Sequence, residues 1–83
     1  MVIKGATAVI SGASKGIGRA TAQAFADEGA TVFSLDIEKP KKSDERITHI
    51  STDVTQGDQV QRALRQIPTI DILMLNEIGR AHV

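Results

Sequence analysis

The chain has no cysteine, tyrosine or tryptophan among its 83 residues. The absence of cysteine excludes disulfide bonds, thiol catalysis and cysteine-ligated metals. The two histidines, His49 and His82, lie far apart without ligand spacing, so we expect no metal site. Basic and acidic residues balance at ten each, which gives no broad electrostatic reason to expect a nucleic acid or an anionic membrane as a partner.

Long hydrophobic runs are also lacking. No stretch approaches the roughly 20 apolar residues that a membrane helix needs, and the N-terminus lacks the pattern of a secretory signal. We therefore expect a cytoplasmic protein without a membrane partner. Hydrophobic residues make up 41% of the chain and charged residues 24%, which is ordinary for a folded protein. The length predicts a single domain over residues 1–83 with a thin core.

Short apolar runs alternate with segments of helical period. The runs predict strands over residues 6–10, 30–35, 47–51 and 70–75. A helix is expected between the first two strands and another between the last two, while the polar segment 38–46 is expected to be a loop. Helices between strands imply right-handed crossovers and a parallel sheet. The expected α/β fold is half of a doubly wound Rossmann fold, with strand order 3-2-1-4 and two main helices.

The two expected helices have recognisable ends and apolar faces. Gly29 stands where a helix C-terminal glycine belongs. Thr55 followed by Asp58 predicts a capping box at the start of the second helix, and Pro68 ends it. The predicted buried faces consist of Ile17, Ala20, Thr21, Ala24 and Phe25 in the first helix and of Val60, Ala63, Leu64 and Ile67 in the second.

The segment Ser11–Gly18 carries the most chemical information. Gly12 permits a tight turn after the first strand, and Gly16 lacks a Cβ, so a phosphate can approach the main chain. Gly18 allows close packing of the helix against the strand. The free N–H groups and the dipole of the helix N-terminus favour an anion there. The alternative is a turn rich in glycine for packing alone.

An acidic residue, Asp36, ends the second strand 18 residues after Gly18, which is the context that the dinucleotide fingerprint requires. Its carboxylate would accept hydrogen bonds from the adenosine ribose and repel a 2′-phosphate, so it favours NAD over NADP. Lys15 favours NADP more weakly, because a long side chain is free to turn to solvent. The alternatives are a solvated carboxylate and an ordinary surface lysine.

These motifs resemble those of the short-chain dehydrogenases/reductases. The match comprises Ser11–Gly18, Asp36, Asp53-Val54-Thr55, and Ile70–Leu73 leading to Asn76. The resemblance implies that Ser11 hydrogen-bonds within the turn and Ile17 contacts the cofactor near the nicotinamide. It also implies that Asp53 accepts from the adenine amino group beside Val54, while Asn76 steadies the sheet. The expected cofactor-binding residues are Gly12, Ser14, Lys15, Gly16, Ile17, Gly18, Asp36, Asp53, Val54 and Asn76.

Two of these roles have simpler alternatives. Asp53 could be a carboxylate of a helix-entry turn, and Asn76 an ordinary strand-end residue. The family motif around Asn76 is Asn-Asn-Ala-Gly, but here Leu75 precedes it, and Glu77 and Ile78 follow it. The tail from Glu77 to Val83 shows no clear period.

The family's chemistry implies residues that this chain does not contain. Hydride transfer in the family uses a tyrosine as general acid/base, with a lysine four residues later and a substrate-polarising serine. The chain has no tyrosine, so we expect no catalytic residues and a catalytic mechanism that requires a missing C-terminal half. We expect the last strand to pair with that half or with a second copy of the chain. The alternative is a free-standing, non-catalytic nucleotide-binding module.

Overall fold

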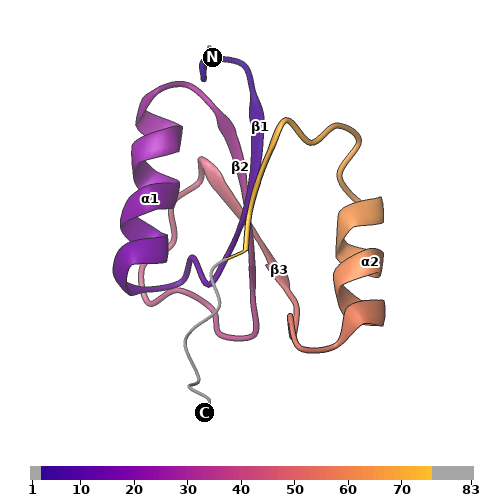
Figure 1. The fold of residues 1–83 in the computed structure, drawn as a ribbon. Helices are drawn as coiled ribbons and strands as arrows, with labels where there is room; N and C mark the ends of the chain where they lie inside the picture. The colour runs from indigo at the N-terminus through magenta and orange to yellow at the C-terminus, as the bar shows by residue number, and fades with distance from the viewer. Residues whose placement is uncertain (1–2, 76–83) are drawn as a thin grey trace.

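The computed structural model describes residues 3–75. They form one four-stranded parallel sheet with a helix on each face (Figure 1). The strand order is β3-β2-β1-β4, which confirms the predicted half of a doubly wound fold. Along the chain the elements are β1 (Thr7–Ser11), α1 (Gly16–Asp27), β2 (Thr31–Asp36), β3 (Ile47–Ser51), α2 (Gly57–Arg65) and β4 (Ile72–Met74).

The central strand β1 explains why the first apolar run is continuous. Ala8, Val9 and Ile10 are completely buried, because neighbouring strands flank β1 on both edges and helices cover both faces. A strand in that position has no solvent-facing side and therefore no need for alternating polar residues. The sequence predicts this strand over residues 6–10, whereas β1 starts and ends one residue later. Its last residue, Ser11, is buried beside the turn.

The face covered by α1 has a core of mostly small side chains. Ile10 and Val32 of the sheet pack against Ala22 and Ala26 of the helix, with Phe25 partly buried beside them. The predicted helix face was wrong in part, because Ile17, Ala20 and Ala24 are exposed. Gly18 must face the turn, and this orientation turns the stripe of alanines toward the sheet. Small side chains let the helix lie close to the strands.

The face covered by α2 follows the predicted pattern, although the helix ends at Arg65 with Gln66 as the C-cap, before Ile67 and Pro68. Ala63 and Ile67 are buried against Val9 and Leu35, and Leu64 packs at the margin of the same cluster. The helix starts later than expected, however, at Gly57 with Gln56 as the N-cap and no side-chain capping bond.

The predicted capping box of Thr55 and Asp58 is therefore wrong. Both the amide and the hydroxyl of Thr55 donate to the carboxylate of Asp53, at 3.0 and 2.6 Å. This local turn occupies the hydroxyl that would otherwise cap the helix, because short polar side chains compete for nearby backbone groups. Asp58 instead forms an exposed pair with Arg62, one turn further along α2.

The connector, defined as residues 37–46, joins β2 to β3 without a helix, as predicted. It passes over the same face of the sheet as α1, and Arg19 of that helix donates to the carbonyl of Lys42 at 2.7 Å. Gly29 also behaves as predicted, with φ of +93° directly after the last turn of α1.

The fourth strand is shorter than the predicted run of residues 70–75. Only Ile72–Met74 pair with β1, and Ile70 and Leu75 lie outside the strand with exposed side chains. The start of the pairing is held by Asp71, whose carboxylate accepts from the amide of Thr7 at 2.8 Å and whose own amide donates to the carbonyl of Thr7 at 2.9 Å.

Within residues 3–75, no helix is long and apolar enough to cross a bilayer. Asn76 and the tail Glu77–Val83 lie outside the described residues, so the structure leaves the predictions made for them as predictions.

Candidate functional site: the glycine-rich turn and the carboxyl ends of the strands

The turn between β1 and α1 has the backbone geometry that its glycines predict. Gly12 and Gly16 have φ of +67° and +64°, a region that side-chain-bearing residues avoid. A Cβ added at Gly16 would meet nothing within 4 Å, so the space above this amide is open. A Cβ at Gly18 would instead lie 2.8 Å from the carbonyl carbon of Gly12. Gly18 thus permits contact between the helix and the turn, and Gly16 leaves the main chain open to an approaching ligand.

The helix that follows begins at Gly16, inside the glycine cluster. Its N-cap, Lys15, makes no side-chain capping bond, and the first turn contains no acidic residue. The amides of a first helical turn have no intrahelical carbonyl to bind, and the helix dipole adds a partial positive charge at the same place. This N-terminus is therefore suited to an external anion, with open space above Gly16 to admit it.

Asp36 lies beside this turn, at the end of β2. Its Oδ2 accepts from the amide of Ser14 at 3.3 Å, and its Oδ1 accepts from the amide of Glu38 at 3.1 Å. A carboxylate can accept about four hydrogen bonds, so each oxygen retains a lone pair for a further donor. The two backbone bonds fix the carboxylate at the carboxyl edge of the sheet, next to the glycine-rich turn.

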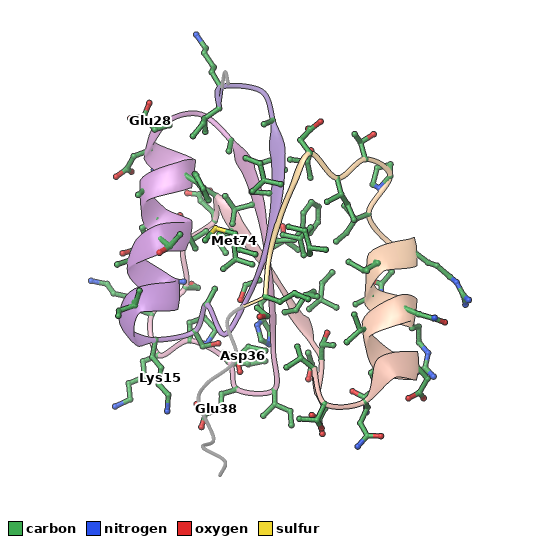
Figure 2. The ribbon with its side chains drawn as sticks, in the orientation of Figure 1. Lys15, Glu28, Asp36, Glu38 and Met74 are labelled. Atoms are coloured by element: carbon green, nitrogen blue, oxygen red, sulfur yellow. The ribbon has the colours of Figure 1, made fainter. Side chains whose placement is uncertain are left out.

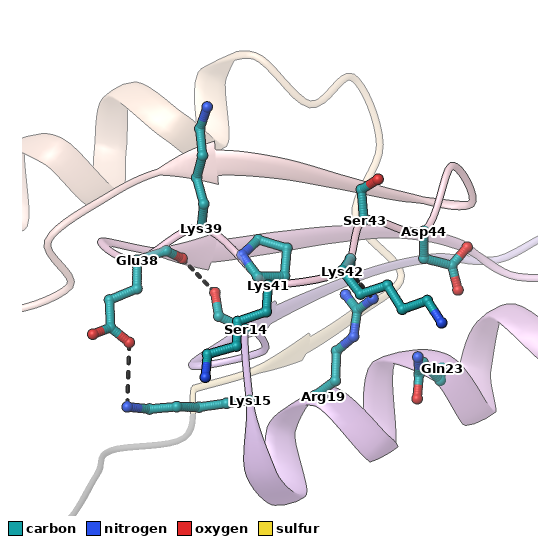
Figure 3. Close-up of a pocket in the computed structure, with 11 residues that line it drawn as sticks. Ser14, Lys15, Arg19, Gln23, Glu38, Lys39, Lys41, Lys42, Ser43 and Asp44 are labelled. Atoms are coloured by element: carbon teal, nitrogen blue, oxygen red, sulfur yellow. Dashed lines mark hydrogen bonds and ion pairs between the residues drawn. The ribbon is translucent and has the colours of Figure 1, made fainter.

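Lys15 extends from the same turn and forms an ion pair with Glu38, with Nζ 3.2 Å from Oε1 (Figures 2 and 3). The buried hydroxyl of Ser14 donates to the carbonyl of Glu38 as well. Glu38 thus contacts two predicted site residues, although the sequence analysis did not select it. The available signal was an acidic residue two positions after Asp36 that could pair with the lysine of the turn.

Asp53 follows β3 on the same edge, since the amide of Thr52 donates to the carbonyl of Asp36 at 3.0 Å. The hydroxyl of Thr55, followed by its amide, lowers the pKa of the Asp53 carboxyl below its usual value. The backbone amide of Asp53 donates to Gln59 of α2 at 2.9 Å. The carboxylate is therefore held in its ionised form beside Val54, whose side chain is exposed.

Ile17 and Ser11 occupy contrasting environments. Ile17 is 84% exposed on the first turn of α1. Ser11 is buried at the end of β1.

The structure brings nine of the ten predicted residues to one end of the sheet, around the turn and the ends of β2 and β3. The tenth, Asn76, lies outside the described part.

A parallel sheet whose central strand enters a helix through an open glycine turn, with a carboxylate at the end of the next strand, defines a dinucleotide-binding fold. Comparison with known proteins makes the assignment specific. The family model for short chain dehydrogenase matches residues 6–79. The chain belongs to the short-chain dehydrogenase family, as the resemblance predicted.

Among curated proteins, the chain is 42% identical over 84 residues to dehydrogenase/reductase SDR family member 6 of Xenopus laevis, covering 96% of this chain and 34% of that protein. The chain thus spans about a third of the length of this relative and corresponds to an N-terminal portion of a family member.

Two solved structures extend the comparison to cofactors. A short chain dehydrogenase from Burkholderia cenocepacia in complex with NADP has a TM-score of 0.84 and 29% identity, covering 93% of this chain and 34% of that one. A short chain dehydrogenase from Leptospira borgpetersenii with bound NAD+ has a TM-score of 0.74 and 25% identity, covering 84% of this chain and 30% of that one. The family neighbours bind either nucleotide.

Proposed function

We propose that residues 1–83 form the adenosine-diphosphate side of an NAD site in a short-chain oxidoreductase. The observation that carries this proposal is the fixed position of Asp36 beside the uncapped N-terminus of α1. The diphosphate would rest on the amides of the turn around Gly12, Gly16 and Gly18. When bound, the nicotinamide supplies or accepts the hydride, and this chain's residues bind and orient the other end of the molecule.

The adenosine would lie between the ends of β2 and β3. Asp36 would accept from the ribose hydroxyls, while Asp53 would accept from the adenine amino group with Val54 beside the ring. The remaining predicted residues would complete this site: Ser14 and Lys15 in the turn, Ile17 toward the nicotinamide, and Asn76 at the end of the sheet.

The preference for NAD over NADP rests on charge. A 2′-phosphate would approach the carboxylate of Asp36, and the ion pair between Lys15 and Glu38 already engages the nearest cation of the turn. Asp36 therefore opposes the extra phosphate directly, and Glu38 offsets the charge of Lys15. Arg19 and Lys39 line the same cavity as Lys15 and Glu38, further from the turn.

The chain itself contains no tyrosine, so we assign it no catalytic residue. The acid/base groups of the proposed oxidoreductase would come from residues outside these 83, joined through the edge of β4 that is unpaired within residues 3–75. The same edge can accept a second copy of the chain.

A matched pair of glycine variants tests the binding site. Gly16→Ala and Gly5→Ala each place a methyl group at positive φ, at +64° and +84°, in space that is otherwise open. The backbone strain is therefore similar, but only Gly16 lies at the proposed phosphate site. Calorimetric titration with NAD should detect binding to the parent and to Gly5→Ala, and at least a tenfold weaker affinity for Gly16→Ala. Equal affinity of the two variants, or no NAD binding by folded parent chain, contradicts the proposal.

A further inference from the structure

The connector encloses two adjoining cavities between itself, α1 and the sheet. The outer cavity, of about 910 Å³, extends along α1 from the turn (Figure 3). The inner cavity, of about 280 Å³, lies deeper, above β2 and β3. The two cavities share Arg19, Lys39, Pro40, Ser43 and Asp44 in their walls.

Unpartnered polar atoms line the inner cavity. Ser34 of β2 is only 2% exposed, and its hydroxyl has no hydrogen-bond partner. His49 of β3 is the register neighbour of Ser34, and both of its ring nitrogens are buried without a partner. Buried polar groups in native proteins are almost always hydrogen-bonded, so three such atoms in one cavity require an explanation.

The charged groups around the cavity leave an excess of positive charge. Asp44 is the acidic group in the inner wall, and Arg46 binds both of its oxygens, at 2.8 to 3.0 Å. Arg19 uses one guanidinium nitrogen for the carbonyl of Lys42 and retains its charge, and Lys39 has no ion pair within residues 3–75. Arg19 also lies near enough to Asp44 for its charge to lower the pKa of that carboxyl, and Arg46 also pairs with Asp27. The three cations Arg19, Lys39 and Arg46 thus exceed the two carboxylates by one charge.

The shape of the donor set indicates the kind of ligand. Residues that carry hydrogen-bond donors line the inner cavity from four elements: Arg19 from α1, Ser34 from β2, His49 from β3, and Ser43 with Lys39 from the connector. Donors that converge from several directions suit a tetrahedral oxyanion better than a planar carboxylate, and the excess of positive charge suits an anion.

The geometry points to an oxyanion site in the inner cavity that binds a compact phosphate group. None of the residues in its wall belongs to the predicted dinucleotide site, so this site is separate from the one proposed above. The connector covers this part of the sheet without forming a helix, and the cavity lies beneath it.

Inorganic phosphate is the probe, titrated into the 83-residue chain at constant ionic strength maintained with sodium chloride. The proton NMR signal of the His49 ring, distinguished from that of His82 by a His49→Gln variant, should shift and reach saturation. The shift should persist when NAD is saturating, because the two sites share no residue. A shift that grows without saturation, or that chloride alone reproduces, overturns the proposal.

Two variants and a control test the residues. Ser34→Ala removes the orphaned hydroxyl without adding volume, and should weaken phosphate binding by about tenfold while leaving NAD binding unchanged. Lys39→Gln, at an exposed position that the fold does not depend on, should also weaken phosphate binding. Thr48→Ala, on the exposed side of β3 next to His49, is the control and should change neither. Unchanged phosphate affinity in both Ser34→Ala and Lys39→Gln means that buried water binds the Ser34 hydroxyl and the His49 ring nitrogens. That result overturns the proposal.

A competition experiment identifies the source of the phosphate. If the cavity receives the 2′-phosphate of NADP, then 2′-AMP will displace inorganic phosphate from His49, whereas 5′-AMP will not. Displacement by 2′-AMP but not by 5′-AMP overturns the assignment of a separate site. Persistence of the phosphate shift in the presence of both nucleotides supports it.

Discussion

The α-carbon of Gly18 faces the carbonyl group of Gly12 so closely that a Cβ built there would lie 2.8 Å from the carbonyl carbon. The obstacle is backbone, which cannot move aside as a flexible side chain can. The contact joins the first turn of α1 to the end of β1, and so determines where the helix N-terminus points.

Gly18→Ala should therefore destabilise the chain by about 2 kcal/mol or more, despite the better helix propensity of alanine. Gly57→Ala is the matched control, because Gly57 is also helical but a Cβ there meets nothing within 4 Å. That control should be neutral or stabilising by about 0.5 kcal/mol. Denaturant unfolding measures both, and equal stability of the two variants would contradict the packing role of Gly18.

Asp36→Asn should change the cofactor preference. The variant keeps the shape of the side chain but removes its charge, so NAD should bind about tenfold more weakly and NADP more tightly. Titration of both nucleotides into parent and variant gives the ratio of affinities. Glu38→Gln, which releases Lys15 from its ion pair, is the comparison. A larger change in preference from Glu38→Gln than from Asp36→Asn would assign the discrimination to the lysine instead.

Asp44 should make the fold sensitive to acid. Hydrogen bonds from the side chain and amide of Arg46 lower the pKa of this carboxyl from 3.8 to about 2. The folded state therefore prefers the ionised form, so its contribution to stability is complete above about pH 4 and is lost as the pH falls toward 2.

Unfolding measured across this pH range should have a shallower slope in Asp44→Asn. Arg46→Gln, which removes the donor and leaves the carboxyl, should flatten the slope to a similar extent. A slope unchanged in both variants would mean that the pair does not persist in solution.

The free edge of β4 should promote self-association. Leu73 is 47% exposed on this strand, which pairs with β1 on one side only within the described residues. Sedimentation of the parent chain should reveal association that increases with concentration, and Leu73→Lys should shift it toward monomer, because charge on an edge strand opposes pairing. Ile37→Lys is the control, since Ile37 is 59% exposed on the connector, away from this edge. A parent that sediments as a monomer at every concentration would contradict the expectation.

The order of elements could be predicted from the sequence because each signal is local. A buried strand such as β1 is a continuous apolar run, and the glycine cluster lies between this run and a segment of helical period. The buried face of α1 could not be predicted in the same way. The apolar period pointed to Ile17 and Ala24, whereas the close contact at Gly18 selects the face that carries Ala22 and Ala26.

The site shows the same division between local and non-local information. The turn and Asp36 were predictable because their spacing along the chain brings them to the ends of neighbouring strands. Asp53 was predicted through the family resemblance. The partnership of Glu38 with Lys15 depends on the path of the connector. The inner cavity depends on the register that sets Ser34 opposite His49, and a single sequence does not specify that register.

The paired hydrogen bonds between Asp71 and Thr7 fix the register of β4 against β1 at the start of the strand. Within residues 3–75, β4 pairs with β1 on one side only. A further strand that adds to the outer edge of β4 would therefore meet a template whose alignment with the rest of the sheet is already set.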